Sequence, residues 1–223
     1  MPEIPRNSLT DPFIFQCDKY EVTGRGIGDV GYFGLQMAQN QNAIIVWDTF
    51  FKFMAHEKID VGRIIELGTG SGGLSVLLAI YCQTVGADFI TYDFNEEQWP
   101  LKHPELFQKL QVDRRLTDLD QPEVAKEVSD LIKQDGTTIL LCDARKAKDW
   151  QDFAKHLKPG DFIASHDYAP SQEYFVEHMV GKIWSHIYLQ EHEIEEICHE
   201  HQLSPVFPEM FLTAAWTCRR KSS

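Results

Sequence analysis

The sequence predicts an α/β fold in which a mostly parallel sheet carries helices on both faces. Two observations lead to this prediction. Short, nearly continuous apolar segments alternate along the chain with segments whose apolar residues recur at helical spacing. Several of the apolar segments are followed directly by glycines or by acidic residues, and such sheets bind their ligands beyond the carboxyl ends of the strands.

The individual elements follow from these patterns. The first predicted helix has Ile44, Trp47, Phe51 and Met54 on one face. The predicted helices cover residues 37–58, 74–83, 122–134, 150–157 and 191–202. The predicted strands are runs rich in apolar and β-branched residues, and they cover residues 63–67, 88–93, 137–143, 161–167 and 210–220. We therefore expect one domain: an N-terminal extension or lid (1–35), a ligand-binding core (36–170) and a C-terminal part (171–223).

Composition excludes several classes of function. The formal net charge of −13 argues against a nucleic-acid partner, because a phosphate backbone requires a basic surface. No segment is apolar enough over a sufficient length to predict a signal peptide or a membrane span. The five cysteines are odd in number and scattered, which is typical of free thiols in a cytoplasmic protein. A small-molecule substrate is the expected partner, and a homo-oligomer is compatible with the sequence.

The segment GTGSGG (68–73) predicts a ligand-binding turn between a strand and a helix. Four glycines in six positions exceed what a tight turn alone requires. The spacing also satisfies the G-x-G-x-x-G pattern of nicotinamide dehydrogenases, so a dinucleotide is one candidate ligand. Glu66, on the strand before the turn, favours S-adenosylmethionine instead, since a carboxylate can pair with the ammonium of a methionine moiety but not with a pyrophosphate. Asp93 can accept hydrogen bonds from ribose hydroxyls with either ligand.

These segments resemble class I S-adenosylmethionine-dependent methyltransferases. The likeness rests on ELGTGSGG, YDFNE and the LKPGD turn before a strand, and it covers roughly residues 36 to 170. It implies a Rossmann-like, doubly wound sheet of seven strands with a reversed last strand, and S-adenosylmethionine as cofactor. Carried over by position, the methionine end of the cofactor would contact Glu66 and the turn residues, and the ribose would contact Asp93. Asp118, after a presumed third strand, is a candidate near the adenine. The turn residues concerned are Gly68, Thr69, Gly70 and Ser71.

A second polar cluster is predicted where two later strands end. Asp143 follows one buried strand, and His166 and Asp167 end the next. Neighbouring strands lie about 4.8 Å apart, so these side chains can converge if their strands are adjacent. Two carboxylates in one crevice repel each other unless a cation joins them. The cluster therefore predicts a divalent metal held by Asp143, His166 and Asp167.

The Asp-x-x-Lys pattern at Asp143 and Lys146 is similar to cation-dependent O-methyltransferases of the catechol and caffeoyl-CoA type. This resemblance implies that the aspartate binds the metal and that Lys146 is the general base. In the cephalosporin hydroxylase and macrocin O-methyltransferase group the following strand ends in Glu-Asp, and the matching pair here is His166–Asp167. An imidazole in place of an oxygen ligand shifts the preference from magnesium toward manganese, iron, cobalt or zinc.

The sequence thus favours a metal-assisted methyltransferase that acts on a hydroxyl of a small molecule. In this reading the pKa of Lys146 has to fall from its free value of about 10.4 for the lysine to act as a base. The alternatives are a metal-dependent hydroxylase or oxidase on the same fold, a nicotinamide dehydrogenase, and a catalytically inactive module that binds the cofactor. The sequence does not identify the acceptor.

Overall fold

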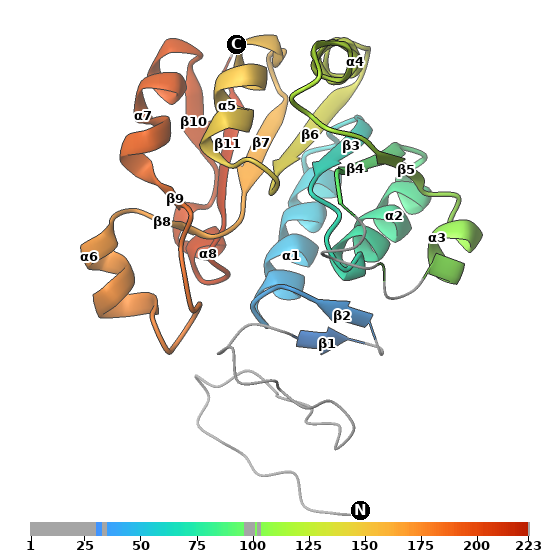
Figure 1. Cartoon of the computed structure of the whole chain (residues 1–223). Coiled ribbons are helices and arrows are strands. Elements are labelled where there is room, and N and C mark those ends of the chain that lie inside the picture. The colour runs from blue at the N-terminus through green and yellow to red at the C-terminus, as the bar shows by residue number, and fades with distance from the viewer. Residues whose placement is uncertain (1–29, 33–34, 96–100, 102–103, 223) are drawn as a thin grey trace, which may run out of the picture.

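The computed structural model describes residues 30–32, 35–95, 101 and 104–222. Its centre is a sheet of seven strands in the order β10-β11-β7-β6-β3-β4-β5 (Figure 1). The strands are β3 (Val61–Leu67), β4 (Asp88–Asp93), β5 (Asp113–Leu116), β6 (Thr137–Cys142), β7 (Phe162–Ser165), β10 (Leu203–Pro205) and β11 (Thr217–Lys221). β11 runs antiparallel to both of its neighbours, whereas the pairs among β3 to β7 are parallel. The predicted seven-stranded sheet with a reversed last strand is confirmed.

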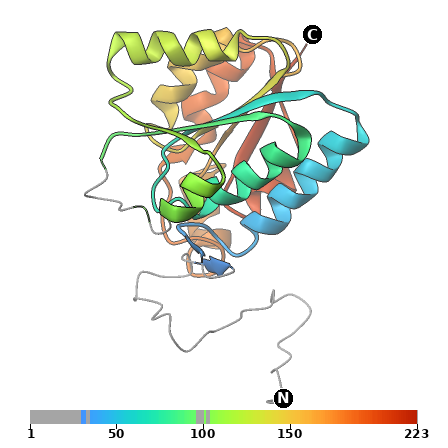
Figure 2. The ribbon, with the colours of Figure 1, turned by 90° about the vertical axis from the view of Figure 1, so that its right-hand side faces the viewer.

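Helices cover both faces of this sheet (Figures 1 and 2). The helices are α1 (Ala43–His56), α2 (Gly73–Val85), α3 (Pro104–Lys109), α4 (Pro122–Ile132), α5 (Ala147–Phe153), α6 (Gln172–Tyr174), α7 (Glu191–Glu200) and α8 (Pro208–Leu212). A 3-10 turn, η1 (Ala154–His156), extends α5, and a π-helical turn, η2 (Phe175–Met179), follows α6. The remaining strands form two small sheets: β1 (Val30–Tyr32) with β2 (Leu35–Met37), and β8 (Tyr168–Ala169) with β9 (Leu189–Gln190).

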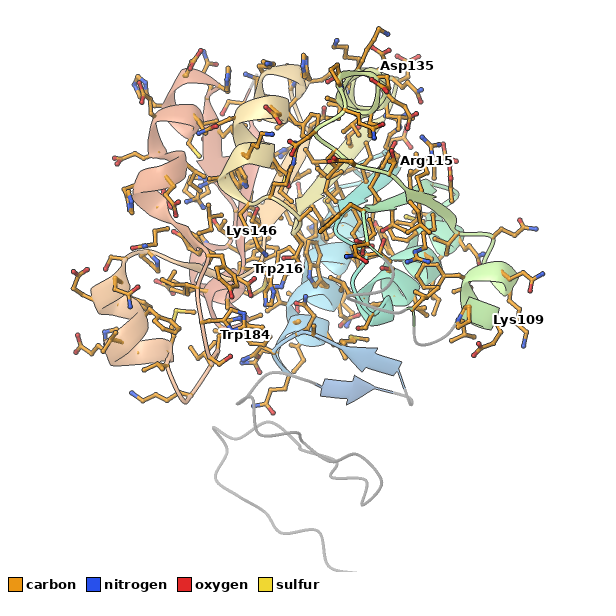
Figure 3. The ribbon with its side chains drawn as sticks, viewed as in Figure 1. Lys109, Arg115, Asp135, Lys146, Trp184 and Trp216 are labelled. Carbon is orange, nitrogen blue, oxygen red and sulfur yellow. The ribbon has the colours of Figure 1, made fainter. Side chains whose placement is uncertain are left out.

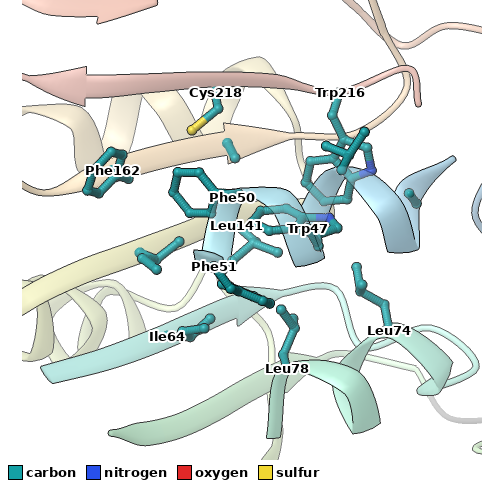
Figure 4. Close-up of a cluster of buried hydrophobic side chains, with 14 of the residues drawn as sticks. Trp47, Phe50, Phe51, Ile64, Leu74, Leu78, Leu141, Phe162, Trp216 and Cys218 are labelled. Atoms are coloured by element: carbon teal, nitrogen blue, oxygen red, sulfur yellow. The ribbon is translucent and has the colours of Figure 1, made fainter. Parts of the chain in front are cut away.

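Successive residues of the central strands enter different cores, because side chains of a strand alternate between the faces of a sheet. In β3, Ile64 packs with α1 and α2, whereas Ile65 packs with α4 and α5. Trp47 is completely buried in the first core, where its ring meets Phe50 edge-on at a centroid distance of 5.7 Å and Trp216 at 5.1 Å (Figure 4). The two cores fix the strands from both sides and so hold the strand ends in place.

Two predicted elements begin later than expected. The segment 37–58 becomes a helix only from Ala43, because Met37 belongs to β2 and the backbone turns at residues 40–42. There the Asn42 N–H donates to Asn40 Oδ1 at 2.7 Å. The predicted final strand 210–220 was wrong in its first half, which is the end of α8 and a turn. Pro208 opens that helix, and its fixed φ favours a first helical turn.

The predicted N-terminal lid lies largely outside the described residues. The cysteines at positions 82, 142, 198 and 218 are free thiols. None of the helices in the described part of the chain is both long and apolar enough to cross a bilayer.

Candidate active site at the carboxyl ends of the strands

A cavity of about 920 Å³ lies where β3, β4, β6 and β7 end. This volume is within the range of small-molecule sites, about 300–1,000 Å³. Seven of the residues singled out from the sequence line it: Gly68, Gly70, Asp93, Asp118, Asp143, Lys146 and Asp167. A second hollow of about 310 Å³ lies beside α4 and α5 and contains none of them. The larger cavity is therefore the candidate site.

The glycine turn forms one wall of the cavity. Gly70 has a φ of +52°, and in the described structure a Cβ built on it would meet no atom within 4 Å. Gly72 differs, because a Cβ there would lie 2.4 Å from Leu101 Cδ1 and 2.9 Å from the Phe107 ring. Gly72 is thus required for packing between the turn and α3, whereas the backbone at Gly70 borders open space that a ligand can fill.

Asp93 connects the end of β4 to this turn. Its Oδ2 accepts a hydrogen bond from the Gly70 N–H at 2.9 Å, and its Oδ1 accepts one from the Phe94 N–H at 2.8 Å. The carboxylate is buried, yet it lines the cavity. Each carboxylate oxygen can accept more than one hydrogen bond, so both can also face ligand hydroxyls.

Glu66 lies beneath the turn and is not among the described residues that line the cavity. Its side chain is only 2% exposed, and its Oε2 accepts hydrogen bonds from Ser75 Oγ at 2.5 Å and Thr91 Oγ1 at 2.6 Å. Burial raises the pKa of Glu66 to about 8, although the two hydroxyls oppose the shift. At neutral pH the ligand-free carboxyl is therefore mostly protonated, and it joins β3, β4 and α2.

Of the other residues predicted near the cofactor, two are buried within the turn and one lines the cavity. Thr69 is buried, and its hydroxyl lies 2.7 Å from that of Thr91. Ser71 is also buried and does not belong to the described lining of the cavity. Asp118 is exposed in the loop after β5, lines the cavity, and accepts a hydrogen bond from the Asp120 N–H at 2.9 Å.

The structure brings the three predicted metal ligands together. β6 and β7 are adjacent and parallel, so Asp143 and the His166–Asp167 pair leave the sheet side by side. One potential ligand atom from each of the three residues lies within 4.8 Å of the other two. This is the convergence expected from the sequence. Asp143 and Asp167 line the same cavity as the glycine turn, whereas His166 is buried and does not belong to the described lining.

The Lys146 ammonium lies between the two carboxylates of this cluster. It contacts Asp143 Oδ1 and lies 2.8 Å from Asp167 Oδ2. Burial alone would lower the pKa of Lys146, but the charges of Asp143 and Asp167 outweigh it and raise that pKa above its ordinary value. Without a second cation Lys146 is therefore protonated, whereas the sequence argument required a lowered pKa for a base.

His166 is packed between aromatic rings. Its ring is 2% exposed and lies against Trp184 and Trp216, with centroid distances of 4.5 and 5.1 Å. Figure 3 shows Trp216 just below Lys146 near the middle of the molecule, and Trp184 lower in the view. Burial lowers the pKa of His166, and its Nε2 has no hydrogen-bond partner among the described residues.

Three side-chain nitrogens surround Asp167 Oδ1. Trp184 Nε1 donates to it at 2.7 Å, His166 Nδ1 lies 3.1 Å away, and His186 Nε2 lies 3.6 Å away. Burial alone would raise the pKa of Asp167, but His166 and Lys146 lower it below its ordinary value. The backbone of Asp167 has a φ of +57°, a conformation that costs energy in a non-glycine residue and is common at functional sites.

Sequence reasoning missed the contribution of residues 184–188. Trp184, His186 and Tyr188 all line the cavity, but they come from a loop without helical or strand periodicity. The local signal is the concentration of rings in WSHIY, which carries no information about where the loop returns to the sheet.

Arg145 was also missed, and it stabilises the cavity wall. Its guanidinium donates to Asp149 Oδ1 at 2.7 Å, to Asp120 Oδ1 at 2.8 Å and to Asp152 Oδ2 at 3.0 Å. Asp149 is completely buried on α5, whereas Asp120 belongs to the exposed turn that carries Asp118. Arg145 therefore connects the turn that carries Asp118 to α5, the helix that follows Lys146.

Comparison with known proteins identifies the fold. The chain matches no protein-family model, and no curated protein sequence matches it. The apo structure of CmcI-N160 aligns with a TM-score of 0.59 and 12% identity, over 87% of this chain and 76% of that one. The Mg-SAM structure of CmcI-D160 has a TM-score of 0.58 and 14% identity, over 99% and 90% of the two chains.

A third similar structure is that of an O-methyltransferase family protein from Burkholderia thailandensis. It has a TM-score of 0.50 and 9% identity, and the alignment covers 82% of this chain and 58% of that one. At such identities the likeness is one of fold. The chain therefore has the fold of the class I S-adenosylmethionine-dependent methyltransferases, as its sequence predicts, and it resembles the CmcI structures.

Proposed function

We propose that this chain binds S-adenosylmethionine and transfers its methyl group to a hydroxyl oxygen of a small molecule, with the assistance of a divalent cation. The observation that carries the proposal is that one cavity joins the glycine turn to Asp143 and Asp167, which form a cluster with the buried His166. Donor and acceptor would thereby be held next to each other, an effect worth up to roughly 7–11 kcal/mol in well-oriented reactions.

The residues present fit the cofactor. The open space at Gly70 allows a ligand to approach the backbone of the turn closely. Asp93 would accept hydrogen bonds from the ribose hydroxyls, and Asp118, which lines the same cavity, would lie near the adenine. Glu66 would interact with the methionine ammonium from beneath the turn, and it would lose its proton if that pairing forms. The Mg-SAM structure of CmcI-D160 supports this choice of ligand.

The residues present also fit a divalent cation. Asp143, His166 and Asp167 would hold it, since two carboxylates supply matching charge and the His166 imidazole supplies a nitrogen donor beside them. When bound, a divalent cation lowers the pKa of a coordinated hydroxyl, by several units in the strongest cases. The metal can be magnesium or a transition metal such as manganese, iron or zinc, and the imidazole favours the latter.

Lys146 would hold the proton that leaves the acceptor hydroxyl. Its ammonium is protonated while it alone neutralises Asp143 and Asp167. It can accept that proton at Nζ only after it has released its own proton to solvent, which would become easier once its two carboxylate partners are engaged by the cation. The rings of Trp184 and Tyr188 would exclude water from the acceptor side of the cavity, because both border it.

The test is a methyl-transfer assay with labelled S-adenosylmethionine, a panel of hydroxylated acceptors, and divalent ions added after treatment with a chelator. We expect transfer that depends on the added ion and is lost in Asp143→Asn. Asp130→Asn, on the exposed face of α4, is the matched control and should retain activity. Transfer that is unaffected by Asp143→Asn or by the chelator would contradict the role of the metal.

A second candidate function is oxidation or hydroxylation on the same fold. It is favoured by the imidazole of His166 beside two carboxylates, since histidine and carboxylate ligands together also hold the non-haem iron of oxygenases. An assay of iron-loaded protein with the same acceptors discriminates between the two functions. Oxygen consumption without methyl transfer would favour the oxidative function.

A further inference from the structure

We propose that His186 is an additional metal ligand, and that the site consequently prefers a borderline transition metal such as cobalt or zinc to magnesium. The inference rests on the metal site of the proposed function and extends it to a residue from a different part of the chain. Asp143, His166 and Asp167 follow β6 and β7, whereas His186 belongs to the loop between η2 and β9.

The position of His186 supports this assignment. Its Nε2 lies 3.6 Å from Asp167 Oδ1, and the Nδ1 of His166 lies 3.1 Å from the same oxygen. Donor atoms that share one ion at about 2.0–2.2 Å are roughly 3–3.5 Å apart, so the His166 separation already suits ligands of one centre. His186 lies just outside that range and outside the group of Asp143, His166 and Asp167, so its ring has to move toward Asp167 to share the ion. His186 also lines the cavity and is 45% exposed. Its Nδ1 lies 2.9 Å from Ser185 Oγ, which leaves Nε2 as the nitrogen that faces Asp167.

The surroundings of the two imidazoles favour such a centre. His166 is fixed by Trp184 and Trp216, and the indole N–H of Trp184 orients the Asp167 carboxylate at 2.7 Å. Partners that orient a ligand in this way are typical of metal sites. Trp184 is two residues from His186, and the two rings lie 5.5 Å apart, so the same tryptophan positions the loop that carries the second imidazole.

The chemistry of the donor set determines the metal. Magnesium prefers oxygen ligands in an octahedral arrangement, whereas imidazole nitrogen is suited to cobalt, nickel, copper and zinc. Two imidazoles and two carboxylates form a mixed nitrogen and oxygen set that selects against magnesium. Without His186 the set would contain one imidazole and two carboxylates, so the preference for a transition metal over magnesium would be weaker.

The test compares the full-length protein with His186→Ala and His178→Ala in titrations with Co²⁺ and Mg²⁺. His178 is the matched control, because it is similarly exposed (47%) and does not belong to the described lining of the cavity. Binding is followed by calorimetry, and the d–d absorption of Co²⁺ reports on its ligands. Thermal unfolding of each variant shows that it is folded.

We expect the wild type and His178→Ala to bind Co²⁺ more tightly than Mg²⁺. His186→Ala should lose about tenfold or more in Co²⁺ affinity, since removal of an orienting partner alone costs 10–100-fold. Its Co²⁺ spectrum should change, and its Mg²⁺ affinity should change little. If His186→Ala matches the wild type while Asp143→Asn abolishes Co²⁺ binding, the role of His186 is wrong but the proposed site stands. If the wild type binds neither ion, both the role of His186 and the proposed metal site are overturned.

Discussion

The buried carboxyl of Glu66 makes the stability of the fold depend on pH in a definite direction. Burial raises its pKa from 4.5 to about 8, so the folded protein binds this proton more tightly than the unfolded chain does. The resulting stabilisation is complete below pH 4.5 and is lost as the pH rises through 8. One pKa unit corresponds to about 1.36 kcal/mol, so the loss is about 3 kcal/mol at pH 7 and about 5 kcal/mol well above pH 8.

Glu66→Gln tests this effect because the amide keeps the size of the side chain but cannot ionise. We expect the free energy of unfolding of the variant to match that of the wild type near about pH 4.5 and to exceed it by about 5 kcal/mol near about pH 8.5. Urea unfolding across this range measures the difference. Glu195→Gln, an exposed substitution on α7, controls for the change of side chain. If the difference between wild type and Glu66→Gln stays constant with pH, the carboxyl is not protonated in the neutral folded protein.

Three further predictions concern the cavity and its wall. Lys146→Met should raise the affinity for Mn²⁺, measured by calorimetry, by about tenfold or about 1.4 kcal/mol, because a competing ammonium is removed; an unchanged affinity would show that Lys146 does not occupy the site. Gly70→Ala should weaken binding of S-adenosylmethionine, with a modest loss of stability of about 1 kcal/mol. Gly72→Ala should instead destabilise the fold by about 1–3 kcal/mol through overpacking. Equal effects of the two variants on affinity and on melting temperature would contradict this distinction. Arg145→Met should lower the free energy of unfolding by about 3 kcal/mol, since it leaves a buried carboxylate unpaired. Lys148→Met, half exposed beside the same turn, should cost less than about 1 kcal/mol in the same urea titration, and similar losses would refute a special role for Arg145.

Much of the site could be predicted because it is formed by strand ends. In a parallel sheet the carboxyl ends of neighbouring strands lie at one edge, so residues that directly follow apolar runs are brought together without knowledge of the loops. Asp93, Asp143 and Asp167 were found in this way, and all three line one cavity. The same reasoning identified the glycine turn.

The errors and omissions have physical reasons of their own. Glu66 lies on the same face of β3 as Ile64, because residues two apart in a strand share a face, and that face is covered by α2. The alternation of side chains along β3 therefore predicts that Glu66 lies beneath the turn. His186 could not be found, since an irregular loop has no period that relates its residues to the sheet. The final strand was placed too early because apolar residues of α8 and of β11 form one continuous run in the sequence.

The position of Lys146 has a consequence for the folding of the metal-free chain. The carboxylates of Asp143 and Asp167 would repel each other, but the ammonium of Lys146 between them supplies a counterion from the chain itself. A newly synthesised polypeptide can therefore reach its native state before any ion is encountered. If the proposed function is correct, loss of the metal would abolish activity without unfolding the protein, and activity would return with the ion.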